Sequence, residues 1–177
     1  MVRYAEAGDA GAIAAVVQRA QDALTARGSL QRLTVPSLDA VAAHIAARTA
    51  HVLVKGRAIV GSAFVEAVTV RRMSVLARWG IDDSASPLWF LHTLVIEPTA
   101  QGRGLGHVLL DGVKAAVATP GPAAIVLDCW AGNGTLRAFY GRAGFQLRGI
   151  FPEADYTIAV FTWYSPPRAA SLPPVQH

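Results

Sequence analysis

Apolar residues recur at helical spacing in two segments near the start of the chain. A short strand at Val2–Ala5 leads to Asp9, a residue type that favours the start of a helix, and this helix is predicted to end near Gly28. A second helix is predicted to begin at Pro36–Ser37. The apolar face of the first helix consists of Ile13, Val16, Val17, Ala20 and Leu24.

Two apolar runs with strand character follow. His51–Lys55 and Ala58–Val70 flank a turn at Gly56 and predict an antiparallel hairpin. The next segment, Arg71–Ser86, has weak periodicity, so we expect a long loop with a helical turn around Val75.

The second half of the chain predicts four more strands and two more helices. One helix follows a glycine-rich stretch and is stopped by Pro120. The other is short, with Asn133 as its cap and Gly144 at the left-handed position after its end. The strands are expected at Leu88–Ile96, Ala123–Trp130, Phe145–Ile150 and Tyr156–Tyr164.

This order of elements predicts a mixed α/β sheet with helices on both faces. The chain has 177 residues, 53% of them hydrophobic, which suits one domain with one core. We expect that domain to span residues 2–164, followed by a Pro-rich tail at 165–177 that is expected to be disordered.

Composition and charge exclude several classes of protein. Charged residues interrupt every apolar run short of membrane-spanning length, and the first residues lack the layout of a signal peptide, so we expect a cytoplasmic protein without a membrane partner. The lone Cys129 excludes an internal disulfide and a cysteine-based metal site. The net charge is +4, but no basic run is interleaved with aromatic residues, so we expect no nucleic-acid partner.

The segment between the strand at Leu88–Ile96 and the next helix has the character of a phosphate site. Three alternating glycines, Gly102, Gly104 and Gly106, let backbone N–H groups approach a ligand at the positive end of a helix. Arg103 and His107 would add charge at the rim. A P-loop is excluded because Gly-Lys-Ser/Thr does not occur, and the glycine spacing does not fit a dinucleotide fingerprint.

These residues resemble the GNAT (Gcn5-related) N-acetyltransferase family. Gln101–Gly106 is similar to that family's Q/R-x-x-G-x-G/A signature, and Leu94–Pro98 looks like the strand end that precedes it. Asn133–Phe145 resembles the second motif, in which Asn begins a short helix that carries an aromatic-Tyr pair before Gly-Phe. The resemblance covers residues 2 to 164 and is specific over about 90 to 145.

The resemblance implies a mixed, mostly antiparallel sheet with a splayed central strand pair. In that cleft the pantetheine arm of acetyl-CoA would pair with the backbone of Leu94, Val95 and Ile96. Asn133 would reach the pantetheine side, and no metal is expected. The residues implied to hold the pyrophosphate are Gln101, Gly102, Arg103, Gly104, Leu105, Gly106 and His107.

Transfer of an acetyl group to an amine requires that a proton leave the ammonium and that a proton reach the departing thiolate. Tyr140 matches the family tyrosine beside the sulfur and is the predicted acid. His92, similar to a histidine of arylalkylamine N-acetyltransferases, is the predicted base, although a packing role for it is equally open; Glu97 and an ordered water are the alternatives. Cys129 is interpreted as a buried small hydrophobe rather than an acyl carrier.

The predicted function is therefore N-acetyl transfer from acetyl-CoA to a primary amine of a small molecule or peptide, with a homodimer left open. A non-catalytic acyl-CoA-binding module on the same fold is the alternative, and a nucleotide-binding switch is a distant third. The acceptor is not identified by the sequence. Residues expected near it are Arg32, Arg71, Arg72, Trp79, Asp82, Asp83, Glu153 and Asp155.

Overall fold

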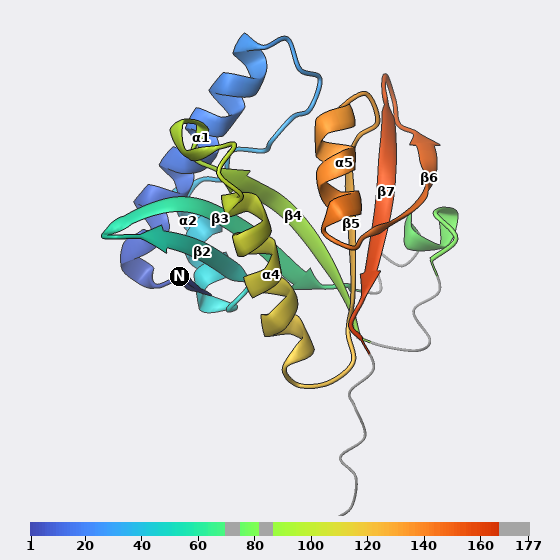
Figure 1. Ribbon diagram of the computed structural model, residues 1–177. Coiled ribbons are helices and arrows are strands. Elements are labelled where there is room, and N and C mark those ends of the chain that lie inside the picture. Colours follow the sequence, from blue (N-terminus) through green and yellow to red (C-terminus); the bar gives the residue numbers. More distant parts are fainter. Residues whose placement is uncertain (70–74, 82–86, 167–177) are drawn as a thin grey trace, which may run out of the picture.

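The computed structural model describes residues 1–69, 75–81 and 87–166, and its centre is a seven-stranded sheet (Figure 1). The strand order is β1-β2-β3-β4-β5-β7-β6, and all neighbours are antiparallel except β4 and β5, which are parallel. This mixed, mostly antiparallel sheet confirms the predicted fold class. The strands are β1 (Val2–Tyr4), β2 (Ala50–Lys55), β3 (Ala58–Ala67), β4 (Leu88–Ile96), β5 (Ala124–Trp130), β6 (Gln146–Pro152) and β7 (Thr157–Tyr164).

Helices cover both faces of the sheet. On one face, α1 (Ala10–Ala26) and α2 (Leu38–Ala46) pack on β2 and β3 through an apolar cluster that includes Val41 and Phe64. The other face carries α4 (Leu105–Ala118) and α5 (Gly134–Arg142) (Figure 1). Short 3-10 turns occupy Ala7–Asp9 and Pro98–Ala100.

The segment predicted as a long loop contains a helical turn at residues 75–78, as expected around Val75. Leu76 and Trp79 are buried there against Val126 and Val160 of the sheet. Arg71, Arg72, Asp82 and Asp83 lie outside the described residues, as do Val70 and positions 167–177 of the predicted tail.

One extra residue in β4 reverses the alternation of its side chains. Phe64 lies opposite His92 and Ser62 opposite Val95, so two steps along β3 correspond to three along β4. Thr93, inside this bulge, has a φ of 52°. Leu91 before the bulge and Leu94 after it therefore both face α4, whereas His92 and Val95 face α1 and α2.

Two local expectations are corrected by the fold. Asp9 stands at the start of α1, but its carboxylate does not cap the helix; it accepts hydrogen bonds from Arg3 Nη1 at 2.7 Å and from the Glu6 N–H at 2.8 Å. The hydrogen bond from Arg3 lowers the pKa of this carboxyl group. In α2 the helical spacing of Leu38, Val41, Ala42 and Ile45 in the sequence predicts one apolar side, but Leu38 is 58% exposed, whereas His44 of the same helix stacks on Phe64.

His51 is a buried histidine in β2, 2% exposed, whose ring lies 4.5 Å from that of Tyr4. Burial lowers the pKa of His51 from 6.5 to about 4. Between these two values the unfolded chain binds a proton that the folded chain does not bind. Folding is therefore favoured by His51 above pH 6.5, and this contribution is lost as the pH falls toward 4.

We predict that the free energy of unfolding decreases from pH 6.5 to pH 4, with His51 contributing a slope of up to about 1.4 kcal/mol per pH unit. Urea unfolding at several pH values measures the slope. His51→Gln should be less stable at neutral pH and show a shallower dependence over this range. An unchanged slope in the variant would assign the acid sensitivity to other groups.

Candidate active site

A cleft opens where β4 separates from β5. The two strands pair only at Leu88 with Ala124, Trp89 with Ile125 and Phe90 with Val126, although β4 continues to Ile96 and β5 to Trp130. A pocket of about 180 Å³ lies in this gap. The splayed central strand pair implied by the sequence resemblance is thus present.

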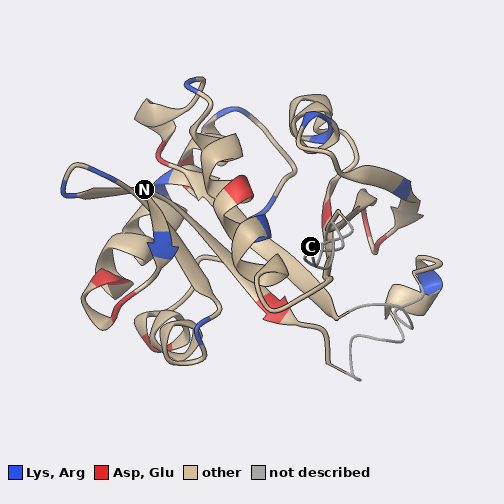
Figure 2. Ribbon diagram, turned by 60° about the horizontal axis from the view of Figure 1, so that its bottom comes forward, with Lys and Arg blue, Asp and Glu red and all other residues tan. Residues whose placement is uncertain are grey.

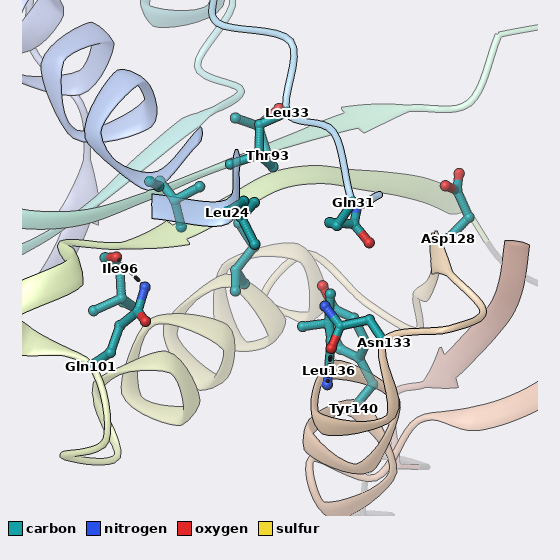
Figure 3. Close-up of a pocket in the computed structure, with 13 residues that line it drawn as sticks. Leu24, Gln31, Leu33, Thr93, Ile96, Gln101, Asp128, Asn133, Leu136 and Tyr140 are labelled. Carbon is teal, nitrogen blue, oxygen red and sulfur yellow. Dashed lines mark hydrogen bonds between the residues drawn. The ribbon is translucent and has the colours of Figure 1, made fainter. Parts of the chain in front are cut away.

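The pocket brings together residues from several parts of the chain (Figure 3). β4 contributes Thr93, Leu94, Val95 and Ile96, and α5 contributes Leu136 and Tyr140 together with its cap Asn133. Gln101 and Asp128 lie at opposite ends in this view. The remaining lining residues, from α1 and the loop after it, are Ala20, Leu24, Gln31 and Leu33.

The glycine loop next to this pocket forms a cradle of free backbone donors. Gly102 and Gly104 both have a φ of 75°, and Gly104 is the N-cap of α4. Within the described part of the chain, the N–H groups of residues 102–106 donate no hydrogen bond, whereas those of His107 and Val108 donate to the Gly104 carbonyl. Left-handed residues beside a helix N-terminus concentrate N–H groups as an anion site. A pyrophosphate fits these donors.

The predicted rim residues of the cradle differ in what their side chains do. Arg103 is exposed and available to an anion. The imidazole of His107 instead packs on Phe139 of α5, with ring centroids 4.5 Å apart, so its side chain joins the two helices. Gly106 lies against the same ring, and a Cβ there would come within 3.1 Å of Phe139.

Two polar side chains that line the cleft form hydrogen bonds with the backbone around it. The Gln101 amide donates to the Ile96 carbonyl at 3.0 Å, which ties the cradle to the end of β4 (Figure 3). The Asn133 side chain accepts a hydrogen bond from the Leu136 N–H at 3.0 Å, as its predicted capping role requires.

Tyr140 is 5% exposed, and its ring lies within 6 Å of those of Phe139, Phe145 and Phe161 while the residue still lines the pocket. Burial raises the pKa of Tyr140 far above its ordinary value, with Cys129 and Asp128 adding to the effect. The phenol is therefore protonated at neutral pH. Tyr140 therefore packs in the aromatic core and also lines the cleft.

His92 is on β4 but faces away from α4, toward α2. Its Nδ1 lies 3.1 Å from Thr93 Oγ1, and its Nε2 lies 3.7 Å from Glu66 Oε2. His44 of α2 approaches the other oxygen of Glu66 through Nδ1 at 3.4 Å. These three side chains are 20 to 33% exposed. His92 does not line the pocket itself, whereas its neighbour Thr93 does.

The structure also shows the surroundings of Glu97, the alternative base, and of Cys129, the alternative acyl carrier. The Glu97 carboxylate is held by Arg19 of α1, with Nε at 3.0 Å from both oxygens and Nη2 at 2.7 Å from one. This two-pronged contact directs Glu97 toward α1. Cys129 is 1% exposed, and burial raises its thiol pKa to about 11, so it is not a thiolate at neutral pH.

Sequence reasoning missed Thr93, Asp128, Gln31, Glu66 and His44. Asp128 is the one carboxylate in the otherwise apolar strand β5, and that charge is the signal that could have identified it. Gln31 reaches β5, where its Oε1 accepts from the Trp130 N–H at 2.7 Å. Of the residues expected near the acceptor, Trp79 is buried, and Glu153 and Asp155 are exposed.

The described Lys and Arg residues are spread over several elements, with Asp and Glu residues among them (Figure 2). Among the described residues, no helix is both long and apolar enough to cross a membrane.

Comparisons with known proteins agree with this architecture. Residues 38–145 match the model of the Acetyltransferase (GNAT) family. No curated protein sequence matches the chain. A GNAT-family acetyltransferase structure from Streptococcus agalactiae superposes with a TM-score of 0.76 at 19% identity, covering 94% of this chain and 95% of that one.

Two further structures share the fold. A putative acetyltransferase from Salmonella typhimurium, solved with its cofactor acetyl-CoA, gives a TM-score of 0.70 at 17% identity over 97% of this chain and 96% of its own. A ribosomal-protein-alanine N-acetyltransferase from Brucella melitensis gives 0.66 at 16% identity over 92% and 98%. The family model, which matches more than half of the chain, and the splayed sheet with its glycine cradle lead to one conclusion: this protein belongs to the GNAT acetyltransferase family.

Proposed function

We propose that this protein is an N-acetyltransferase that moves the acetyl group of acetyl-CoA to a primary amine of a small molecule or peptide. The observation that carries the proposal is a continuous site: the edge of β4 beyond Phe90 and Tyr140 line one pocket, and Gln101, which lines the same pocket, leads directly into the cradle at residues 102–106. Coenzyme A has amide groups for the edge of β4, a sulfur for Tyr140 and a pyrophosphate for the cradle. The structure from Salmonella typhimurium, solved with acetyl-CoA on the same fold, supports acetyl-CoA as the cosubstrate.

Direct attack in a ternary complex suits the residues available. The single cysteine is buried and protonated, so an acyl-enzyme on Cys129 is disfavoured. The net reaction converts an ammonium and a thioester into an amide, a thiol and one proton. His92 takes the first proton from the ammonium, which frees the nitrogen lone pair for attack on the carbonyl carbon.

Tyr140 acts when the carbon–sulfur bond breaks. The phenol gives its proton to the departing sulfur. Because burial raises its pKa, a tyrosinate would not persist, and Tyr140 must recover a proton from the nitrogen of the tetrahedral intermediate. This exchange consumes no residue and leaves the enzyme ready for a second turnover.

The cradle generates the first test of this function. Gly104→Ala introduces a Cβ into open space where we place the pyrophosphate, and we expect the dissociation constant of coenzyme A to rise at least about tenfold by calorimetry. Gly56→Ala is a matched control, since Gly56 also has positive φ and open space but lies in the β2–β3 turn. Both variants should lose similar stability; equal coenzyme A affinities in the two would refute the cradle.

Turnover against a panel of amines tests the activity itself. We expect acetyl-CoA-dependent release of free thiol with at least one primary amine, and Tyr140→Phe should reduce kcat by about 10²–10⁴ while acetyl-CoA binding persists. Tyr164→Phe is the control, because Tyr164 is exposed where β4 and β5 still pair. Coenzyme A binding without turnover of any amine would favour the non-catalytic acyl-CoA-binding module. If kcat of Tyr140→Phe falls less than tenfold, the role of Tyr140 is packing and not proton transfer.

The role of His92 is tested through the pH–rate profile. An ordinary imidazole titrates at about pH 6–7, so a rate limb in that range should vanish in His92→Gln together with most of the activity. Acetyl-CoA affinity should be unchanged, since His92 does not line the pocket. If the limb and the rate both persist, the base lies elsewhere; Asp128 is then the next group to examine, because it lines the pocket whereas Glu97 is bound by Arg19.

A further inference from the structure

We propose that Thr93 passes the proton of the acceptor ammonium from the cleft to His92, and that Glu66 and His44 are positioning residues that hold His92 for this step. The inference deepens the proposed function and rests on it. It removes the main difficulty with His92 as a base, namely that His92 faces α2 and does not line the pocket.

Thr93 occupies a backbone conformation that threonine rarely adopts. Its φ is 52°, and among the described residues other than glycine only Arg48 shares a positive φ. A β-branched residue is strained in this region, and glycine would form the same bulge at lower cost. The side chain must therefore serve some purpose besides the bend, and its hydroxyl group is the feature that glycine lacks.

The hydroxyl of Thr93 connects two environments. The residue lines the pocket between β4 and α5 (Figure 3), and its Oγ1 lies 3.1 Å from His92 Nδ1. The Glu66 carboxylate lies on the other side of the ring, 3.7 Å from Nε2. A negative charge at that distance favours the tautomer with the proton on Nε2. Nδ1 is then an acceptor, and Thr93 donates to it.

Glu66 is itself held from a third element. His44 Nδ1 lies 3.4 Å from Glu66 Oε1 and 2.9 Å from Thr49 Oγ1, and the His44 ring stacks on buried Phe64 at 4.3 Å. The groups that face His92 thus come from α2, β3 and β4. Partial burial of this cluster strengthens the attraction between Glu66 and a protonated His92. The Thr93 hydroxyl, the His92 imidazole and the Glu66 carboxylate thus form one ordered series that starts at a residue lining the cleft.

The proton step balances without another reactant. The ammonium gives one proton to Thr93 Oγ1 as the hydroxyl gives its own proton to His92 Nδ1. The products are a neutral amine and an imidazolium whose charge faces Glu66, and Thr93 ends as it began. After acetyl transfer, His92 releases the proton to solvent.

The test compares Thr93→Val with Thr93→Ser. Valine keeps the β-branched shape and the backbone strain but removes the hydroxyl, whereas serine keeps the hydroxyl. With an alkylamine at pH 7 we expect Thr93→Val to lose about 10²-fold or more in kcat and Thr93→Ser to stay within about threefold of the parent. The deficit of the valine variant should shrink as the pH rises and free amine becomes abundant. Acetyl-CoA affinity and melting temperature check the fold of both.

A second measurement does not depend on turnover. NMR of the ¹⁵N-histidine-labelled protein should show His92 as the Nε2–H tautomer with a hydrogen-bonded Nδ1, and Thr93→Val should change the Nδ1 shift alone. An Nδ1–H tautomer, or equal rates in the valine and serine variants, overturns the relay while leaving the proposed function intact. Absence of turnover with every amine in the parent protein overturns both.

Discussion

Beyond Phe90 and Val126, β4 and β5 each retain one hydrogen-bonded neighbour and lose the other. β5 stays paired with β7 to its end, and β4 stays paired with β3 through its bulge, so each strand is held firmly on its outer side. Backbone groups that face the gap have no strand to satisfy them, which makes the opening costly unless a ligand or water supplies partners. The pocket, the exposed edge of β4 and the access to Tyr140 all depend on this separation.

The same separation decides which side of the sheet each group occupies. Tyr140 belongs to the core beneath α4 and α5, whereas His92, Glu66 and His44 belong to the opposite face. In a fully paired sheet these groups could not act on one bond, because a continuous ladder of strands would lie between them. A substrate that extends through the gap meets both sets.

Much of this arrangement was predictable from local patterns. The bounds of β4 and the capping role of Asn133 follow from short-range preferences, and both agree with the structure. The alternation after the bulge was not predictable, because one inserted residue exchanges the two faces of the strand. Asp9 was misjudged because Arg3, from another element, competes for its carboxylate. His44 reaches Glu66 and His92 only through the packing of α2 on the sheet, and Glu66 lies near His92 only because β3 pairs with β4 in this register; the sequence carries no local signal for either.

The burial of Cys129 has a consequence for the chemistry of the product. Each turnover of the proposed reaction would release a free thiol inside the cleft, which is bordered by β5, the strand that carries the only cysteine of the chain. Thiol–disulfide exchange needs a thiolate and an open approach to sulfur. Cys129, enclosed and with a pKa of about 11, offers neither. Under oxidising conditions the folded protein is therefore protected from forming a mixed disulfide with the molecule it releases.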